Sequence, residues 1–338
     1  MYKFGRQQGT KMEIIEVKQN WPKGYFRIDF AIGNICNYKC WYCFPGSNNA
    51  TYKWPDYKLT VKNLSHLLDY YIKNTDKKKF EICLLGGEVT HWKNFISFIQ
   101  YFKERYNCIF SLTTNGSKKL DWWKQAAPYL DQVTLSHHQE WANKEHLREV
   151  ADLLYESDVL LDMTVLMDPK LWDNCIESIE FYKKSRRRWS IRMHEVLQNF
   201  LQDPIPYTED QLKTISKLRA RSSNPFYYLR VNKLFRTKVT VVDKDKRKHR
   251  LGDSQILHDR LNKFYNWECT LGVEWVSIKP NGNIEGSCSN FLYNDSTISY
   301  NIYDTNFIEK FHPSIVSTIC NQDCCWCGFE TNMPKKKI

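Results

Sequence analysis

The 338-residue chain lacks the long hydrophobic runs of a membrane protein. No stretch approaches the roughly 18 uninterrupted apolar residues of a membrane-spanning helix, and the polar segment 1–24 contains no apolar core of a signal peptide. Low-complexity tracts are absent, as are internal repeats other than strand–helix units, and hydrophobic residues make up 42% of the chain, so disorder is not the default. We therefore expect a folded, soluble, cytoplasmic protein.

Charge favours the basic side, with 49 Lys and Arg against 38 Asp and Glu and a formal net charge of +11. Basic runs such as 77–79, 186–188 and 244–248 contribute to it, and a solvated surface is their ordinary interpretation. The functional interpretation is an anionic partner: an acidic peptide, a nucleotide or nucleic acid. No recognisable nucleic-acid motif accompanies the 12 Trp and 20 Tyr.

Twelve cysteines need an explanation, because clustered cysteines in a reducing compartment more often bind metal or do redox work than form disulfides. Three lie in one short loop with C-x3-C-x2-C spacing, Cys36, Cys40 and Cys43. A second group lies towards the C-terminus: Cys269, Cys288, Cys320, Cys324, Cys325 and Cys327. The remaining three lie in apolar segments and are expected to be small buried hydrophobes: Cys83, Cys108 and Cys175.

Strand-like and helix-like segments alternate over the first 200 residues. Strands are expected at 26–32, 80–85, 108–113, 132–135, 160–166 and 189–196, and helices at 61–73, 92–105, 120–127, 145–155 and 172–183. Thr60 is the expected N-cap of the first helix. Six strand–helix repeats predict an α/β fold, a partial (β/α)6 TIM-like barrel whose chemistry sits at the carboxyl ends of the strands.

Beyond residue 200 the pattern changes. We expect a helix at 209–221, a hairpin or loop around 243–250, and a β-hairpin that turns at Asn281-Gly282 and brings Cys269 and Cys288 toward each other. The predicted organisation is an N-terminal extension at 1–24, the barrel at 25–200, a basic linker or insert at 201–265, a small cysteine-rich α+β extension at 266–330 and a basic tail without structure at 331–338.

The cysteine loop follows the first predicted strand, Tyr42 precedes its last cysteine, and Gly86-Gly87-Glu88 ends the second strand. Together these features resemble the radical S-adenosylmethionine (radical SAM) superfamily over roughly residues 25–200. The resemblance implies a [4Fe–4S] cluster held by Cys36, Cys40 and Cys43, with SAM chelating the fourth iron. It also implies that Tyr42 lies against the adenine and that the Gly-Gly-Glu segment receives the amino group of SAM.

Later strand ends supply further candidates. The resemblance implies that Asn115 and Ser136 hold the ribose and carboxylate of SAM. Arg192 and His194 could face the same cavity, although side chains alternate along a strand and the sequence does not fix their phase.

The segment Ser136-His137-His138-Gln139-Glu140 is less typical of the family. His138 or Glu140 could handle a substrate proton, because histidine titrates near neutral pH. A polar loop cap is the alternative interpretation of this segment.

The C-terminal cysteines resemble the SPASM and twitch extensions of radical SAM enzymes, which hold auxiliary [4Fe–4S] clusters. A full SPASM pattern needs about seven cysteines, so the six present favour one auxiliary cluster in a twitch-like domain. Its expected ligands are Cys269, Cys288, Cys324 and Cys327, with Cys320 or Cys325 as a possible replacement. A structural zinc ion bound by the same four cysteines is the alternative.

The resemblance further implies a reaction. An external donor of the flavodoxin or ferredoxin type reduces the cluster, SAM is cleaved to methionine and a 5′-deoxyadenosyl radical, and the radical removes hydrogen from a substrate carbon. The leading hypothesis is a peptide substrate that is crosslinked, epimerised or dehydrogenated, since a basic surface suits an acidic leader peptide. A dehydrogenase or rearrangement enzyme acting on a nucleotide or amino sugar is the second hypothesis. A non-catalytic zinc-binding nucleic-acid protein is the third, and Gly-Gly-Glu counts against it.

Overall fold

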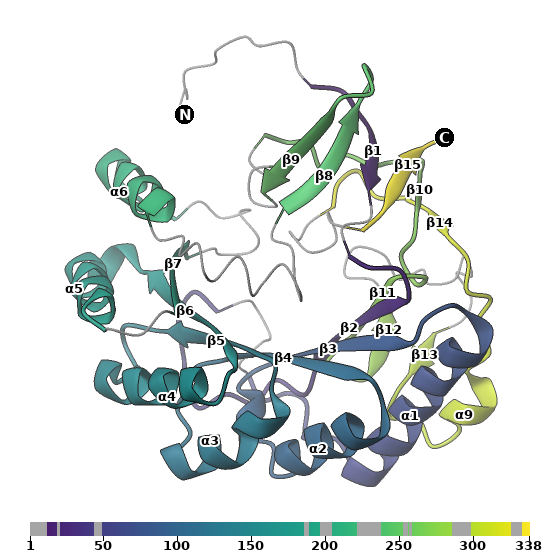
Figure 1. The fold of residues 1–338 in the computed structure, drawn as a ribbon, viewed down its shortest axis with the longest axis horizontal. Helices are drawn as coiled ribbons and strands as arrows, with labels where there is room; N and C mark the ends of the chain where they lie inside the picture. Colours follow the sequence, from purple (N-terminus) through teal and green to yellow (C-terminus); the bar gives the residue numbers. More distant parts are fainter. Residues whose placement is uncertain are drawn as a thin grey trace.

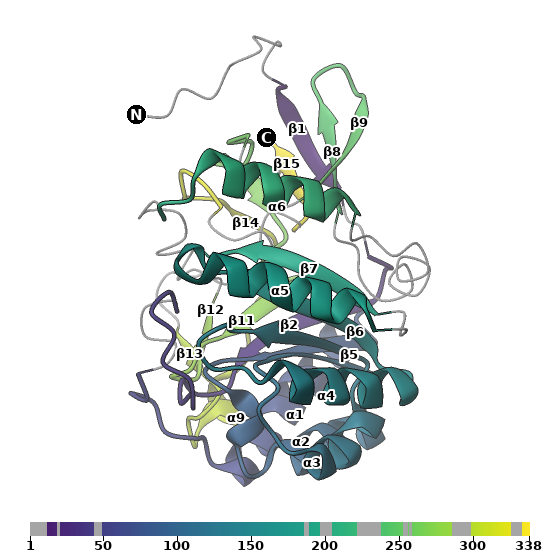
Figure 2. The same ribbon diagram turned by 90° about the vertical axis from the view of Figure 1, so that its left-hand side faces the viewer.

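The computed structural model describes residues 12–18, 21–43, 49–185, 189–196, 205–221, 238–252, 256, 259–285, 299–325 and 333–338. The described strands form one sheet of nine strands and one of six. Figures 1 and 2 show helices α1–α4 on one face of the nine-stranded sheet and the six-stranded sheet on the opposite side. Within the described residues, no helix is both long enough and apolar enough to cross a bilayer.

The six strands predicted in the first 200 residues are confirmed. They run parallel and in chain order through the nine-stranded sheet. Their bounds are β2 Tyr25–Ala31, β3 Lys79–Leu85, β4 Cys108–Thr114, β5 Gln132–His137, β6 Leu160–Met167 and β7 Ser190–Glu195.

Helices connect these strands as the sequence pattern predicted. They are α1 Tyr57–Asn74, α2 Phe95–Arg105, α3 Leu120–Ala126, α4 Lys144–Glu156 and α5 Trp172–Lys183, with short 3-10 turns at Val89–His91, Ala127–Tyr129 and Pro169–Leu171. The expectation that Thr60 caps the first helix is wrong. The N-cap is Asp56, whose side chain accepts a 2.8 Å hydrogen bond from the backbone N–H of Leu59, and Thr60 lies inside the helix.

The two faces of the barrel sheet differ in chemistry. The helix-facing residues of β2, such as Phe26, Ile28 and Phe30, are fully buried in the main hydrophobic core. The alternate residues face the barrel interior, where Arg27 donates to Asp29 Oδ1 at 2.7 Å and to Glu81 Oε1 at 2.5 Å. The interior is therefore lined with paired polar groups.

The predicted β-hairpin at Asn281-Gly282 is confirmed. Strand β11 (Trp275–Ile278) pairs antiparallel with β12 (Asn283–Glu285), and Gly282 takes a φ of +90° at the turn. The hairpin extends the barrel sheet, because β11 runs parallel to β2. The edge continues with β13 (Tyr300–Asn301), and α9 (Phe307–Lys310) packs against α1.

The six-stranded sheet has the order β14-β10-β15-β1-β8-β9. Its strands are β1 Ile14–Lys18, β8 Lys238–Asp243, β9 Lys248–Gly252, β10 Trp267–Cys269, β14 Thr318–Ile319 and β15 Lys335–Lys337. The predicted hairpin around 243–250 is confirmed as β8–β9. Helix α6 (Glu209–Arg221) is confirmed as well, and Figure 2 shows it above α5, on the side of this sheet.

The expectation of an unstructured tail is wrong. Strand β15 lies between β10 and β1 and pairs antiparallel with both. Only the first of its three lysines is buried: Lys335 is 3% exposed, and its Nζ donates to Met333 O at 3.1 Å. The sheet combines strands from four of the predicted regions, and the domain boundaries themselves stay a prediction.

Candidate active site

The cysteine loop lies where the carboxyl ends of four barrel strands meet. From the end of β3, Glu88 N donates to Ile35 O at 2.8 Å. From the end of β4, Asn115 Nδ2 donates to Asn37 Oδ1 at 2.9 Å and stands 4.0 Å from the sulfur of Cys36. From beyond β5, His138 Nδ1 stands 3.3 Å from the sulfur of Cys40. The loop after β2 is therefore held by its three neighbouring strand ends.

Glu88 braces these strand ends from inside the protein. Its side chain is 1% exposed, and its Oε1 accepts hydrogen bonds from the hydroxyls of Thr90 and Thr114 at 2.6 and 2.7 Å. Its Oε2 accepts from the backbone N–H of Asn115 at 2.6 Å. Burial raises the pKa of Glu88, and these hydrogen bonds oppose that shift. The carboxylate thus ties β3 to β4 and fixes the backbone of Asn115.

The two glycines before Glu88 make room for the cysteine loop. A Cβ at Gly87 would stand 2.3 Å from the carbonyl oxygen of Ile35 and 2.8 Å from the carbonyl carbon of Asn34. A Cβ at Gly86 would stand 2.8 Å from Gly33 O, and Gly86 also has a φ of +148°. No side chain fits between this turn and the loop. That the glycines also approach SAM stays a prediction.

Burial affects the pKa of two of the loop thiols, those of Cys36 and Cys40. Cys40 is buried, whereas Cys36 and Cys43 are half-buried. Burial raises the pKa of Cys40 to about 12, opposed by a hydrogen bond from Tyr42, and burial also raises the pKa of Cys36. Thiols of this kind become thiolates when metal cations bind them, so the donor set fits an iron cluster.

The three loop thiols are not arranged around one metal-ion position. Among the described residues, no group of three or more His, Cys, Asp and Glu side chains could hold one metal ion. In a four-iron cluster each cysteine binds its own iron, so the three sulfurs need not converge on one point.

Tyr42 and His138 form an aromatic pair beside Cys40. Their rings stack with centroids 5.8 Å apart and an interplanar angle of 9°, and Tyr42 Oη lies 2.9 Å from His138 Nδ1. Burial, with a smaller contribution from His137, lowers the pKa of His138 to about 4, so this imidazole is neutral at pH 7. Glu140 is exposed. The proposed proton-handling role of His138 or Glu140 stays a prediction.

The structure fixes the strand phase that the sequence left open. Leu135 and Met193 belong to the helix-side core, so their neighbours Ser136 and Arg192 face the barrel interior. His194 shares that face and is exposed, with its Nδ1 2.7 Å from Glu195 O. Arg192 Nη2 forms an ion pair with Asp162 Oδ2 at 2.9 Å. The interior candidates therefore lie on one face of the sheet, on β5 and β7, which flank β6.

Sequence reasoning missed two supports of the loop. Trp41 Nε1 donates to Asp168 Oδ2 at 2.8 Å, and Lys170 Nζ lies 3.8 Å from the centroid of the Trp41 ring. The pair Asp168-Pro169, which begins two residues beyond the fifth predicted strand, was the available indication. Thr114 was also missed, although it directly precedes Asn115 at a strand end.

The described C-terminal cysteines gather at the six-stranded sheet. Cys269 ends β10, Cys320 follows β14 and donates its N–H to Trp267 O at 2.8 Å, and Cys325 N donates to Asn262 O at 2.8 Å. Cys320 and Cys325 share that sheet's hydrophobic core, and Cys324 is half-buried. Cys288 and Cys327 lie outside the described residues, so the ligand set stays a prediction.

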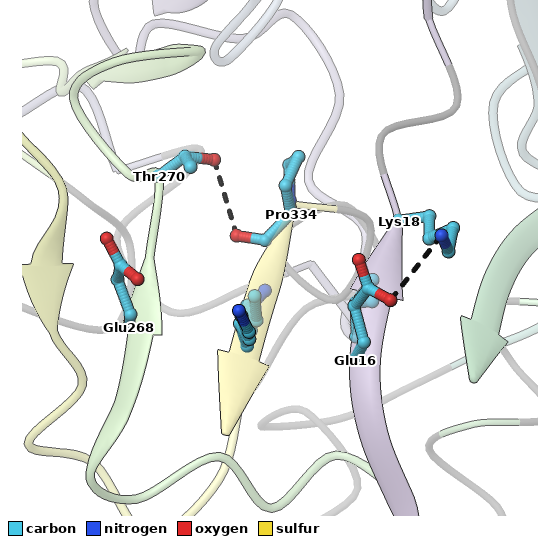
Figure 3. A pocket seen from close by; sticks show the side chains of 8 residues that line it. Glu16, Lys18, Glu268, Thr270 and Pro334 are labelled. Atoms are coloured by element: carbon cyan, nitrogen blue, oxygen red, sulfur yellow. Dashed lines mark hydrogen bonds and ion pairs between the residues drawn. The ribbon is translucent and has the colours of Figure 1, made fainter. Parts of the chain in front are cut away.

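A cavity of about 430 Å³ lies on the same sheet (Figure 3). Its lining comes from β1, β10, β15 and their flanks: Glu16, Val17, Lys18, Glu268, Thr270, Pro334, Lys335 and Lys336. None of the predicted site residues lines it, so it is separate from the cysteine loop.

Comparisons with known proteins agree with this geometry. Residues 30–157 match the family model described as the radical SAM superfamily. The GTP 3′,8-cyclase of Haemophilus influenzae (strain PittGG) is 32% identical over 110 residues, which are 31% of this chain and 32% of that protein. The GTP 3′,8-cyclase of Actinobacillus pleuropneumoniae serotype 3 (strain JL03) is 28% identical over 118 residues, 33% of each chain. The chain thus spans about a third of the length of these curated relatives.

Solved structures share the fold over most of the chain. Polyhistidine-tagged anSMEcpe with bound AdoMet has a TM-score of 0.54 at 14% identity, covering 86% of this chain and 81% of that one. Native anSMEcpe with bound AdoMet and Kp18Cys peptide has a TM-score of 0.52 at 14% identity, with the same coverage. The predicted partial-barrel α/β fold is confirmed.

Proposed function

We propose that this chain is a radical SAM enzyme, since residues 30–157 match the radical SAM family model, and that it reductively cleaves SAM and abstracts hydrogen from a substrate carbon. When bound, the cluster supplies the electron that splits a C–S bond of SAM into methionine and a 5′-deoxyadenosyl radical. The observation that carries the proposal is the convergence of three strand ends, at Glu88, Asn115 and His138, on the cysteine loop.

In this proposal Cys36, Cys40 and Cys43 are the protein ligands of the [4Fe–4S] cluster. The chain's own contribution is to fix them: Glu88 N holds the carbonyl of Ile35, the residue before the first ligand. Cys40 is only 9% exposed, so little solvent reaches its side chain. Three ligands leave one iron for SAM.

The residues proposed to bind SAM lie at the same strand ends. Tyr42 would meet the adenine with the ring face turned away from His138, and Gly86, Gly87 and Glu88 would receive the amino group. Asn115, Ser136 and Arg192 would hold the ribose and carboxylate. Two of them face the barrel interior, Ser136 and Arg192, and the ion pair with Asp162 orients the guanidinium there.

For the rest of the chain we propose one auxiliary [4Fe–4S] cluster. Its ligands would come from Cys269, Cys288, Cys324 and Cys327, with Cys320 or Cys325 as a replacement. The burial of Cys269, Cys320 and Cys325 around one sheet supports this assignment. The proposed electron donor is a flavodoxin- or ferredoxin-type protein.

The proposed substrate is a peptide. The fold likeness to anSMEcpe, whose solved structure holds AdoMet and a peptide, extends over 86% of the chain and supports this choice. A nucleotide is the second candidate, because the curated relatives are GTP 3′,8-cyclases. The net charge of +11 suits either anionic substrate.

The central test is anaerobic reconstitution with iron and sulfide, reduction by dithionite, and chromatography for 5′-deoxyadenosine. The wild-type protein should form it and Cys40→Ala should not. Cys108→Ala is the matched control, since Cys108 is also buried but begins β4, at the opposite end of the strand. Cleavage of SAM by a variant lacking all three loop cysteines would sink the proposal.

Iron counting tests the second cluster. Two clusters predict about seven to eight irons per chain, and a count near four removes the auxiliary cluster. Zinc found in the purified protein at one ion per chain would instead favour a structural zinc site.

Substrate class is tested by adding GTP or acidic peptides to the reduced protein. The correct class should raise the yield of 5′-deoxyadenosine and be converted to a product that chromatography separates from the substrate. Crosslinking or dehydrogenation also lowers the mass, whereas epimerisation or rearrangement leaves it unchanged. If GTP alone is converted, the peptide assignment is wrong.

A further inference from the structure

Two side chains meet at the sulfur of one cluster cysteine. His138 Nδ1 lies 3.3 Å from Cys40 Sγ and 2.9 Å from Tyr42 Oη. The Tyr42 hydroxyl and the Cys40 sulfur thus share one ring nitrogen, and both residues belong to the same small hydrophobic cluster. The parallel stack of Tyr42 on His138 fixes both rings, and Tyr38 packs edge-on against His138 with centroids 5.9 Å apart. One imidazole nitrogen therefore contacts both the sulfur and the phenol oxygen.

The direction of these hydrogen bonds follows from the chemistry of the sulfur. A cysteine bound to iron is a thiolate, which accepts and cannot donate. We expect the phenol of Tyr42 to turn its O–H toward this thiolate. The nitrogen of the His138 ring that faces the sulfur and the phenol oxygen is Nδ1. The proton must lie on Nδ1, since a bare nitrogen lone pair there would face the thiolate.

We propose that Tyr42 and His138 are positioning residues that donate hydrogen bonds toward the sulfur of Cys40 and thereby hold the cluster at a less negative reduction potential. The inference rests on the proposed function, because it requires the cluster. Reduction adds negative charge to the cluster and its sulfurs, and hydrogen-bond donors stabilise that charge. In this proposal His138 tunes the cluster rather than transferring a substrate proton. Tyr42 tunes the cluster in addition to contacting the adenine.

The variants separate hydrogen bonding from packing. Tyr42→Phe removes the hydroxyl and keeps the ring. His138→Phe keeps a flat ring against Tyr42 and removes the N–H, whereas His138→Asn places an amide N–H near the position of Nδ1. Tyr106→Phe and His66→Phe are matched controls on helices of the opposite face: Tyr106 caps α2, and His66 packs against Phe307 and Phe311.

The readout is the midpoint potential of the reconstituted cluster without substrate, from an anaerobic redox titration followed by electron paramagnetic resonance. Tyr42→Phe and His138→Phe should shift to a more negative potential than wild type. His138→Asn should recover most of the shift, and both controls should titrate like wild type.

Two results overturn the inference while leaving the proposed function intact. One is wild-type potential in Tyr42→Phe and His138→Phe at full iron content. The other is loss of iron in His138→Phe together with unchanged potential in Tyr42→Phe, which would make both roles structural. A wild-type protein that binds no cluster refutes the proposed function itself, and the inference falls with it.

Discussion

Adding one methyl group at Gly87 should empty the cluster site without unfolding the barrel. The backbone conformation does not require glycine at position 87, because the φ of Gly87 lies outside the left-handed region. It is a glycine because its Cβ would stand 2.3 Å from Ile35 O and 2.5 Å from Ile35 C. Both are backbone atoms of the segment that leads into Cys36.

The size of the effect follows from these distances. An ordinary contact begins at 3.4 Å, so the Ile35 carbonyl must move by about 1 Å. That movement breaks the 2.8 Å hydrogen bond from Glu88 N to Ile35 O. Overpacking costs about 1–3 kcal/mol and the lost hydrogen bond about 1 kcal/mol. The cysteine loop should therefore be displaced from the strand ends, and Cys36 should move with it.

The assay is iron and sulfide per chain after reconstitution, paired with urea unfolding. Gly87→Ala should lose most of the iron at the loop while its unfolding free energy falls by about 2–4 kcal/mol.

Gly24→Ala is the matched control. Gly24 has a φ of +78°, and its Cβ would stand 3.3 Å from Asp76 O, away from the loop. This variant should lose about 1–2 kcal/mol of stability from left-handed strain and keep its iron. Wild-type iron content in Gly87→Ala, or equal iron loss in both variants, would refute the reasoning.

Three further predictions concern other supports of the fold. Glu88→Gln should lower the unfolding free energy by about 2 kcal/mol, because an amide NH2 would face the hydroxyls of Thr90 and Thr114 or the N–H of Asn115. A urea midpoint equal to that of the wild type would contradict this prediction. Deleting residues 334–338 removes β15 from between β10 and β1 and should lower the urea midpoint sharply, whereas an unchanged midpoint would mean that β15 contributes nothing. Burial lowers the pKa of His137 to about 4, against about 6.5 in the unfolded chain, so the free energy of unfolding should fall by up to about 3 kcal/mol as the pH drops from 6.5 to 4. In urea titrations at several pH values, His137→Asn should reduce this pH dependence. An unchanged pH dependence would exclude His137 as its source.

The barrel could be predicted from the sequence because its elements are defined locally. Helices α5 and α6 begin and end at the predicted residues, since apolar spacing along a helix depends only on neighbouring residues. The start of α1 was missed because the cap is Asp56, four residues before Thr60. The loop cysteines and Gly86-Gly87-Glu88 were predicted for the same local reason: both follow strand patterns.

The six-stranded sheet could not be predicted in the same way. Strand β15 consists of three lysines, which carry no alternation of apolar and polar residues. It is a strand because β10 and β1, from distant parts of the chain, pair with it on both sides. Strand phase in the barrel was equally hidden, because both faces of such strands are covered.

Two adjacent histidines show what the strand phase decides. His137 ends β5 on the helix side, where its Nδ1 meets the hydroxyl of Tyr182 at 2.6 Å. His138, one residue later, meets Cys40. The sequence does not show that the two side chains face opposite sides of the strand. One residue of register therefore separates a histidine that stabilises the core from one that contacts the cysteine loop. The same reasoning applies to Gly87, whose importance lies in the backbone of Ile35 opposite it rather than in its own conformation.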